Sequence, residues 1–313
     1  MVRLPSSFPM SVNRPPHWQI ALVLGVGVLA VSTAAVLVRW GVAGLATDSL
    51  GMTVGLSIFL ASGRLSLAAL FLIPQFYTWP WLDLTRQNLR WALAAGVALA
   101  AHFSLWFTSL NYTSVAASTT LVTTTPIWSA LVGYLWQRQT LQPRAWVGMA
   151  IALGGSALIG TAEPTSAVAR NPLLGNALAI AAAWAVSAYF ICGQAAQKAG
   201  LAIHHYALVA YATAAVVLLP LPPLLGLTYG GWPLKLYGAI LLLALIPQLV
   251  GHTSLNWGVR WLSPTWVTLL VLAEPIAASL FALLLFGEVP TTAVMTGGSL
   301  VLVGLSVALW PRP

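Results

Sequence analysis

Long apolar segments recur along the whole chain, and the short stretches between them hold most of the prolines and charged residues. Ten segments of about 20 residues can be placed, which is the length that a helix needs to cross a bilayer. Their expected bounds are 18–39, 50–75, 91–110, 115–136, 144–161, 173–196, 204–225, 236–259, 264–286 and 291–310. Because the apolar runs are continuous rather than alternating, they indicate helices and not the strands of a membrane barrel. The pattern predicts an all-α membrane protein with ten transmembrane helices.

Composition supports a membrane setting. Of the 313 residues, 59% are hydrophobic and only 6% are charged, whereas a soluble domain carries about a quarter charged residues. The 15 tryptophans exclude intrinsic disorder, because disordered chains are poor in aromatic residues. The net charge of +8 comes from scattered Lys and Arg without a basic run, so we expect the lipid bilayer and no nucleic acid as a partner. Nothing in the composition indicates an oligomeric state.

The titratable residues do not predict a metal or a cofactor. The one cysteine, Cys192, lies in an apolar run and has no second cysteine to pair with, which is typical of a packing residue. His204 and His205 are adjacent, but the other histidines are remote in sequence and no Cys/His spacing indicates zinc or iron. We therefore expect no metal site and no cofactor.

The positive charges predict the orientation, since cytoplasmic loops of membrane proteins are enriched in Lys and Arg. Residues 1–17 show no cleavable signal pattern and are expected to form a cytoplasmic tail. With this end inside, nine of the 13 basic residues fall on the cytoplasmic side: Arg3, Arg14, Arg86, Arg90, Arg138, Arg144, Lys198, Arg260 and Arg312. An even number of spans then places both termini in the cytoplasm. We expect the protein in the plasma membrane, which is the inner membrane if the source is bacterial.

The two halves of the chain look like copies. A shift of 149 residues aligns Pro126 with Pro275 and Gly148 with Gly297, and a shift of 150 aligns His102 with His252. The shift covers five spans, and an odd number turns the second copy upside down in the bilayer. We expect two inverted-topology five-helix repeats, 18–161 and 173–310, joined by an extracytoplasmic linker at 162–172.

Several motifs resemble a known family. They are Gly251-His252-Thr253-Ser254-Leu255-Asn256-Trp257-Gly258-Val259-Arg260-Trp261-Leu262-Ser263-Pro264-Thr265, then Glu274-Pro275 and Gly287-Glu288, with Leu110-Asn111-Tyr112-Thr113-Ser114 and Thr125-Pro126 in the first half. They are similar to the two EamA domains of the drug/metabolite transporter superfamily. The resemblance implies a ten-helix inner-membrane carrier, commonly an exporter of amino acids, other small metabolites or toxic organic compounds.

The chain departs from the family pattern at two places. Val31 stands where the first helix of the family often has tryptophan, although the second half keeps Trp184. Arg138 and Gln139 replace a Gly-Glu pair that the second half retains. The first half is therefore the poorer guide to the substrate.

Two charged residues fall near the middle of expected spans, where a charge costs about 2.5–3.5 kcal/mol on insertion scales. Glu274 precedes Pro275, which removes a backbone donor and is expected to bend the helix. Its carboxyl group either binds the substrate or a proton, or it has a structural role as the partner of a cation or as a hydrogen-bonded helix cap. Arg64 stays charged and needs a carboxylate, carbonyls or water. We expect a structural or gating role for Arg64, and pairing with Glu274 would satisfy both.

The eighth expected span carries a polar stripe. Gln248, His252 and Asn256 recur at i, i+4 and i+8, so they share one helical face that should meet a cavity or another helix. His252 is a second proton-site candidate, or a neutral ring that holds a helix contact. His102 and Trp106 form an i, i+4 pair in the third span, and by the repeat His102 occupies the place of His252.

The fourth and sixth spans add further candidates for a substrate cavity. Thr124, Thr125 and Trp128 surround Pro126, which frees a carbonyl near the middle of the membrane. Threonine hydroxyls also bond to their own helix, so these residues either line a cavity or only pack within the membrane. Trp184 and Tyr189 in the sixth span supply aromatic area suited to a planar or cationic solute, or to the core.

These features favour a secondary active transporter that exports or exchanges small organic metabolites, such as amino acids, by alternating access around a mid-membrane cavity. The coupling ion is open, with protons as one choice. Primary pumping is not indicated because the chain has no Walker motif. An intramembrane enzyme is a weaker alternative, since the chain has no Gly-x-Ser-x-Gly, no His-Glu-x-x-His and no paired intramembrane carboxylates. A passive channel or scaffold is the third alternative.

Overall fold

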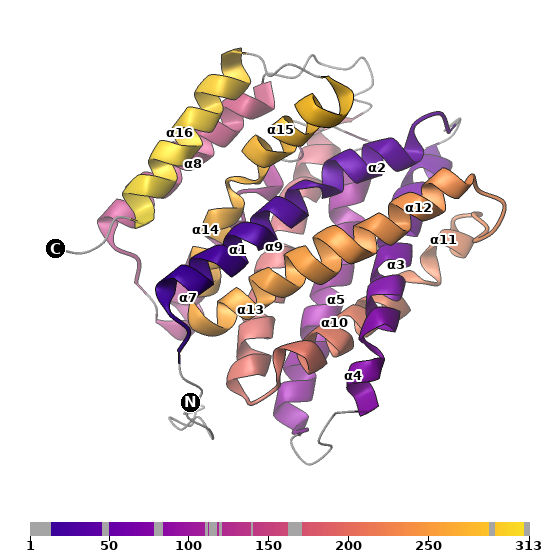
Figure 1. Ribbon diagram of the computed structural model, residues 1–313, viewed down its shortest axis with the longest axis horizontal. Coiled ribbons are helices and arrows are strands. Elements are labelled where there is room, and N and C mark those ends of the chain that lie inside the picture. The colour runs from indigo at the N-terminus through magenta and orange to yellow at the C-terminus, as the bar shows by residue number, and fades with distance from the viewer. Residues whose placement is uncertain are drawn as a thin grey trace.

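The computed structural model describes residues 14–45, 50–77, 84–109, 112, 118, 121–138, 140–161, 171–287 and 292–309. Every regular element in these ranges is a helix (Figure 1). The helices are α1 (His17–Ser32), α2 (Ala34–Val42), α3 (Leu50–Leu72), α4 (Pro74–Tyr77), α5 (Arg86–Ser109), α7 (Thr125–Gln137), α8 (Pro143–Thr161), α9 (Pro172–Lys198), α10 (Ile203–Leu218), α11 (Leu221–Leu224), α12 (Leu234–Leu243), η2 (Ala244–His252), α13 (Thr253–Trp261), α14 (Pro264–Val271), α15 (Glu274–Phe286) and α16 (Thr292–Leu309).

The chain is a multi-pass membrane protein. Over the described ranges, eight segments are helical, long and apolar enough to cross a bilayer: His17–Val42, Val54–Leu72, Arg86–Ser109, Pro172–Lys198, Ile203–Leu224, Leu234–Trp261, Pro264–Leu285 and Thr292–Leu309. They match eight of the ten expected spans. The other two expected spans, 115–136 and 144–161, contain α7 and α8, and part of the first lies outside the described residues. The total of ten stays a prediction.

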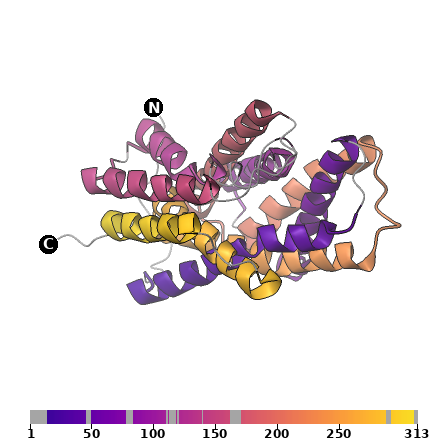
Figure 2. The same ribbon diagram turned by 90° about the horizontal axis from the view of Figure 1, so that it is seen from above.

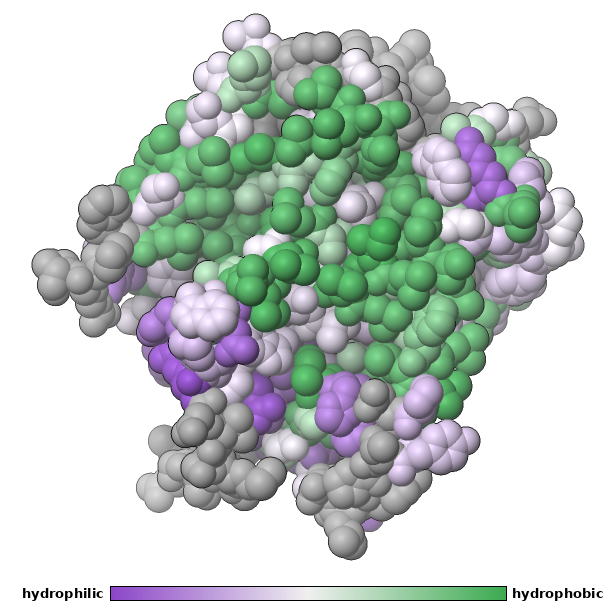
Figure 3. Space-filling view, viewed as in Figure 1, coloured by the Kyte–Doolittle hydropathy of each residue, from purple (hydrophilic) through white to green (hydrophobic). Residues whose placement is uncertain are grey.

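The surface carries the apolar belt that a bilayer requires. Hydrophobic side chains cover most of the face in Figure 3, and hydrophilic residues gather toward its margins. Large exposed apolar side chains on α8, α9, α15 and α16 belong to this surface, for example Val147, Leu173, Leu284 and Leu302. A water-exposed surface of this kind would aggregate, whereas lipid tails cover it without cost.

The main helix contacts join the first half of the chain to the second. α5 packs along α9, α1 packs along η2 and α13, and α3 packs against α10. α8 and α16 form a further pair, which lies side by side in both ribbon views (Figures 1 and 2). The two halves therefore interlock instead of forming separate bundles, and residues far apart in sequence meet in the centre.

Glycines let α8 and α16 approach closely. A Cβ atom added to Gly148 would lie 2.4 Å from the carbonyl oxygen of Gly304, and one added to Gly304 would lie 2.5 Å from the carbonyl oxygen of Gly148. Contact of this kind through small residues is how membrane helices gain packing energy without a hydrophobic driving force.

The start of α1 and the end of α16 lie close together. His17 and Leu309 line a common pocket with Arg144 at the start of α8. Most of the expected tail, 1–17, lies outside the described residues, and so does most of the expected linker, 162–172. The cytoplasmic placement of both ends stays a prediction.

Candidate functional site

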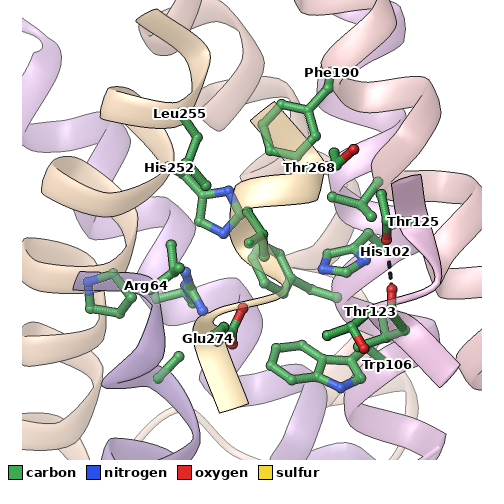
Figure 4. A pocket seen from close by; sticks show the side chains of 17 residues that line it. Arg64, His102, Trp106, Thr123, Thr125, Phe190, His252, Leu255, Thr268 and Glu274 are labelled. Atoms are coloured by element: carbon green, nitrogen blue, oxygen red, sulfur yellow. Dashed lines mark hydrogen bonds between the residues drawn. The ribbon is translucent and has the colours of Figure 1, made fainter. Parts of the chain in front are cut away.

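A cavity lies among the helices, and several of the residues singled out in the sequence line it (Figure 4). The space within it that a water molecule can reach is about 70 Å³, which is enough for a few waters or a small polar group. Six candidates line it: Arg64, His102, Trp106, Thr125, His252 and Glu274. These come from α3, α5, α7, η2 and α15, so both halves of the chain build the walls.

Two broken helices open onto the cavity. A turn at Thr123 and Thr124 precedes α7, and a turn at residues 272–273 precedes α15. Thr125 and Glu274, the first residues of α7 and α15, both line the cavity. A helix start at membrane depth must satisfy its first N–H groups, and here those of Ile127 and Ile276 bond to the carbonyl oxygens of Thr124 and Ala273 in the preceding turns.

Pro126 and Pro275 occupy the second position of these helices. We expected Pro275 to bend its helix, but the structure shows it at the start of α15, after a turn. Proline is well suited to this position, because the first helical N–H groups have no partner within the helix and its φ angle is already helical. The prolines thus fix where each helix restarts, and Thr125 and Glu274 are placed at the cavity as a result.

Arg64 is fully buried in the middle of α3. Its Nη2 atom donates a hydrogen bond to Oε1 of Gln248 at 2.7 Å, and its guanidinium carbon lies 4.3 Å from the ring centroid of Phe103. Its Nε and Nη1 atoms have no hydrogen-bond partner among the described residues. Direct pairing with Glu274, which the sequence left open, is not formed through hydrogen bonds, because none of the three nitrogens bonds to Glu274. The amide and the ring hold the guanidinium in place while leaving donors free.

Glu274 is half-buried and faces the cavity from the first turn of α15. A helix N-terminus carries a partial positive charge, which favours a carboxylate there. Arg64 lies within electrostatic reach of this carboxylate, and Figure 4 shows both side chains ending at the cavity. The cavity thus contains one permanent positive charge and one carboxyl group.

The polar stripe of the eighth span faces inward as expected, but its members have different environments. His252 lines the cavity, and its Nδ1 atom has no hydrogen-bond partner within the described ranges. Gln248 binds Arg64, and Asn256 donates a hydrogen bond to the hydroxyl of Tyr189. These two amides and Tyr189 lie behind the lining and position it. Part of this span, η2, has a π-helical backbone and contains Pro247.

His102 and Trp106 both line the cavity from α5. Nδ1 of His102 lies 2.9 Å from the carbonyl oxygen of Ala182 on α9, so this ring links two helices. The rings of His102 and Trp106 are stacked with centroids 5.8 Å apart. His102 therefore has a bond to a second helix that Nδ1 of His252 lacks, although the repeat aligns them and both rings contact Phe103.

Three further candidates, Thr124, Trp128 and Trp184, do not line the cavity either. Thr124 and Trp128 are absent from the lining, and Nε1 of Trp128 donates to Oγ1 of Thr124 at 3.0 Å. Trp184 packs edge to face on Trp128 with ring centroids 5.1 Å apart, and 54% of its surface is exposed. A tryptophan in mid-span need not face a cavity, because a large aromatic ring is equally stable against lipid or a neighbouring ring. The structure therefore places this aromatic pair outside the cavity.

The sequence did not identify the apolar part of the lining. Phe103, Val186, Phe190 and Leu255 contribute to it, and Thr268 adds a hydroxyl that bonds to its own helix. Val186 and Phe190 stand four residues apart on α9, which is a signal for one shared face. The signal is weak, since apolar residues also cover every lipid-facing side. Within the described residues, His, Cys, Asp and Glu form no group that could hold a metal ion.

The fold and the cavity together define a class of protein. Apolar spanning helices enclose a cavity at membrane depth, broken helices open onto it, and opposite charges lie in its wall, which is the arrangement of solute carriers. The chain belongs to the EamA-like transporter family, whose profile matches residues 15–161 and 173–310. It is a multi-pass membrane transporter for small molecules and not an enzyme.

Two relatives share moderate similarity. The chain is 25% identical over 232 residues to the uncharacterized transporter YwfM of Bacillus subtilis (strain 168), a match that covers 73% of this chain and 77% of that protein. It is 25% identical over 214 residues to a "Probable terminal-alkyne amino-acid exporter" of Streptantibioticus cattleyicolor, which covers 68% of this chain and 70% of that protein. A solved crystal structure with 19% sequence identity covers 94% of this chain and 97% of its own, with a TM-score of 0.71. This last likeness shows the shared fold alone.

Proposed function

We propose that the protein is a secondary active transporter that exports or exchanges small organic metabolites, amino acids or related compounds, by alternating access around the central cavity. We place it in the plasma membrane with both termini in the cytoplasm. The observation that carries this proposal is the pair of helix restarts at Thr125 and Glu274, which put one polar group from each half at the same cavity.

The restarts support the proposed inverted repeats. The same shift of 149 residues relates the turn at 123–124 to the turn at 272–273, Thr125 to Glu274 and Pro126 to Pro275. Two related halves of opposite orientation that share one site are well suited to rocking around it, so that the site opens to either side of the membrane. The repeats proposed here are 18–161 and 173–310.

Proton coupling is part of the proposal. Glu274 and His252 both line the cavity and can gain or lose a proton without leaving it. The other charged or titratable groups in the lining are Arg64 and His102. A proton taken up beside Arg64 changes the net charge of the cavity. Binding of the proton would therefore change the affinity of the cavity for a charged solute, and binding of the solute would change its affinity for the proton.

Counterflow in liposomes tests the transport function. Purified protein is reconstituted, the vesicles are loaded with one unlabelled amino acid or organic cation at a time, and uptake of the labelled solute is followed. We expect uptake that saturates with concentration for at least one solute and is absent from protein-free vesicles. Flux that rises linearly with concentration would indicate a channel, and no flux for any solute would rule out the proposal.

A further inference from the structure

We propose that a second pocket, at the membrane interface, binds an anionic phospholipid from the bilayer. The pocket lies between the α8–α16 pair and the start of α1, on the left of Figure 1, and α14 forms one of its walls. The space within it that a water molecule can reach is about 500 Å³, compared with about 70 Å³ in the central cavity. A volume of this size is in the range of small-molecule sites. The proposed site does not depend on the transport function.

Polar residues line the end of the pocket at which helices begin. His17 and Arg144 stand at the starts of α1 and α8, and Thr140 and Gln142 lie in the connection before α8. Each of these side chains can donate a hydrogen bond. The N-terminal ends of α1 and α8 add partial positive charge. This end of the pocket is therefore suited to the charged oxygen atoms of a phosphodiester, which only accept hydrogen bonds.

The charge around the pocket has one sign. Arg144 lines it, and three further arginines, Arg14, Arg138 and Arg260, stand within three positions of a lining residue in the sequence. This spacing keeps their Cα atoms within about 11 Å of a lining Cα atom. No aspartate or glutamate stands as close in sequence to the residues that line the pocket in the described structure. Basic pockets between membrane helices are typical sites for anionic head groups, so the charge selects an anion.

The rest of the lining is apolar and is suited to an acyl chain. Trp266 and Leu270 stand four residues apart on one face of α14, which is about 6 Å along the helix. The other apolar lining residues are Leu262, Ala308 and Leu309. Tryptophan is typical of the level at which lipid head groups lie. A free phosphate would leave these side chains facing water, whereas the chain of a phospholipid covers them. The occupant that matches both ends of the pocket is therefore a lipid.

The helix α14 connects this pocket to the central cavity. Trp266 and Leu270 line the second pocket, whereas Thr268 and Val271 of the same helix line the central cavity. A lipid that packs on Trp266 and Leu270 would therefore stabilise a wall that the two pockets share. A ligand that binds the folded protein and not the unfolded chain raises the melting temperature, so binding of the lipid should be visible as thermal stabilisation.

Thermal unfolding of the purified full chain in a neutral detergent tests the site. Dioleoylphosphatidylglycerol, dioleoylphosphatidylcholine and the water-soluble head group glycerophosphoglycerol are added separately over a range of concentrations. We expect the anionic lipid to raise the melting temperature saturably by at least about 3 °C, and each of the other two to shift it by less than about 1 °C. Equal shifts from the two lipids would overturn the selection of an anion. A shift from glycerophosphoglycerol as large as that from the anionic lipid would indicate a site for free anions, and absence of any shift would rule out the site.

The variant Arg144→Gln assigns the response to this pocket. It removes a charge from the polar end and keeps a hydrogen-bonding side chain, so the shift produced by phosphatidylglycerol should fall to less than about half. Arg90→Gln is the matched control, because Arg90 is an exposed arginine near the start of α5 that does not line the pocket. Its response should equal that of the unchanged protein. Each shift is measured from the lipid-free melting temperature of the same variant, so a change in stability alone does not affect the comparison. Equal responses of the two variants would overturn the assignment.

Deletion of residues 1–13 tests whether the chain itself fills the pocket. We expect the shift produced by phosphatidylglycerol to be the same with and without these residues. A shift that appears only after the deletion would mean that this segment occupies the pocket in the full chain, and it would overturn the proposal. None of these measurements requires transport, so their failure would leave the proposed transport function unaffected.

Discussion

The turn before Pro126 and the turn before Pro275 have a similar backbone but differ in chemistry. Each ends one helical segment and begins another at the cavity wall. The first places the neutral hydroxyl of Thr125 there, bonded to the Val122 carbonyl at 2.6 Å, and the second places the carboxyl group of Glu274 there. The same restart thus positions a packing group in one half and a charged group in the other.

Arg64 shows the opposite asymmetry. Shifts of 149 and 150 residues pair it with Thr213 and Ala214, and neither residue is charged. The first half of the chain therefore contributes the positive charge of the cavity, and the second half contributes the carboxyl group. In the proposed transport cycle the two halves move relative to each other, so the distance between these charges would change with the state of the transporter.

The largest effect is expected from removing the charge in the first half. Arg64→Met removes the permanent positive charge of the cavity. It should lower exchange at least about 100-fold, because losing a buried charge interaction with the solute costs about 3 kcal/mol or more. The melting temperature should change little, since methionine fills a similar space and removing two unpaired buried nitrogens offsets the lost hydrogen bond to Gln248. Counterflow and thermal unfolding in detergent measure the two effects. A clearly lower melting temperature would support a structural role for Arg64 instead.

Removing the charge in the second half should have a smaller effect on total exchange and a specific effect on pH dependence. Glu274→Gln cannot change its protonation state, so the rate of exchange should depend less on pH, with a residual dependence from His252. The measurement is the exchange rate over a range of pH. Ser279→Ala is the control, because Ser279 lies on the same helix, bonds to the Pro275 carbonyl and does not line the cavity. If the variant keeps both the rate and the pH profile of the unchanged protein, Glu274 has no part in proton coupling.

The spans and the charged positions could be predicted from the sequence because both are strong local signals. An apolar run of 20 residues has few interpretations, and Arg64 and Glu274 stand out because a charge in such a run is costly. Pro126 and Pro275 indicated disturbed helices for a similar reason, since proline removes a helical hydrogen bond, although a helix start and not a bend was found at Pro275. These features depend on single residues and their immediate neighbours.

The exact lining could not be predicted, because it depends on which side of each helix faces inward. Trp184 and Phe190 lie on the same helix, and both are large and aromatic, yet one is half exposed and the other lines the cavity. In a soluble protein the polar face of a helix distinguishes such positions, but a membrane helix is apolar all round. The π-helical stretch η2 adds a second difficulty, since it changes the spacing by which Gln248 and His252 share a face.

The two histidines that the repeat aligns offer a further comparison. His252→Ala should lower exchange several-fold, about 1 kcal/mol in effect, and should lower the melting temperature less than His102→Ala does, because it loses ring contacts with Phe103 and Tyr189 but its Nδ1 atom has no hydrogen-bond partner among the described residues. His102→Ala should lower the melting temperature, because it loses the bond to the Ala182 carbonyl, which is worth about 0.5–1.5 kcal/mol. Counterflow and thermal unfolding of both variants separate the roles. The reverse pattern would place the functional histidine on α5.

The smallest effect is expected at the tryptophan outside the cavity. Trp184→Phe should leave exchange within about twofold of the unchanged protein, as is usual for positions away from a site, because its ring is 54% exposed and packs on Trp128. The matched variant Trp106→Phe alters a cavity residue whose indole nitrogen has no partner in the described structure, and it should lower the apparent affinity several-fold. Since both variants remove the same atoms, a difference between them reports position and not size. Equal effects would mean that α9 presents Trp184 to the solute at some stage of transport, and the cavity would then extend beyond its present lining.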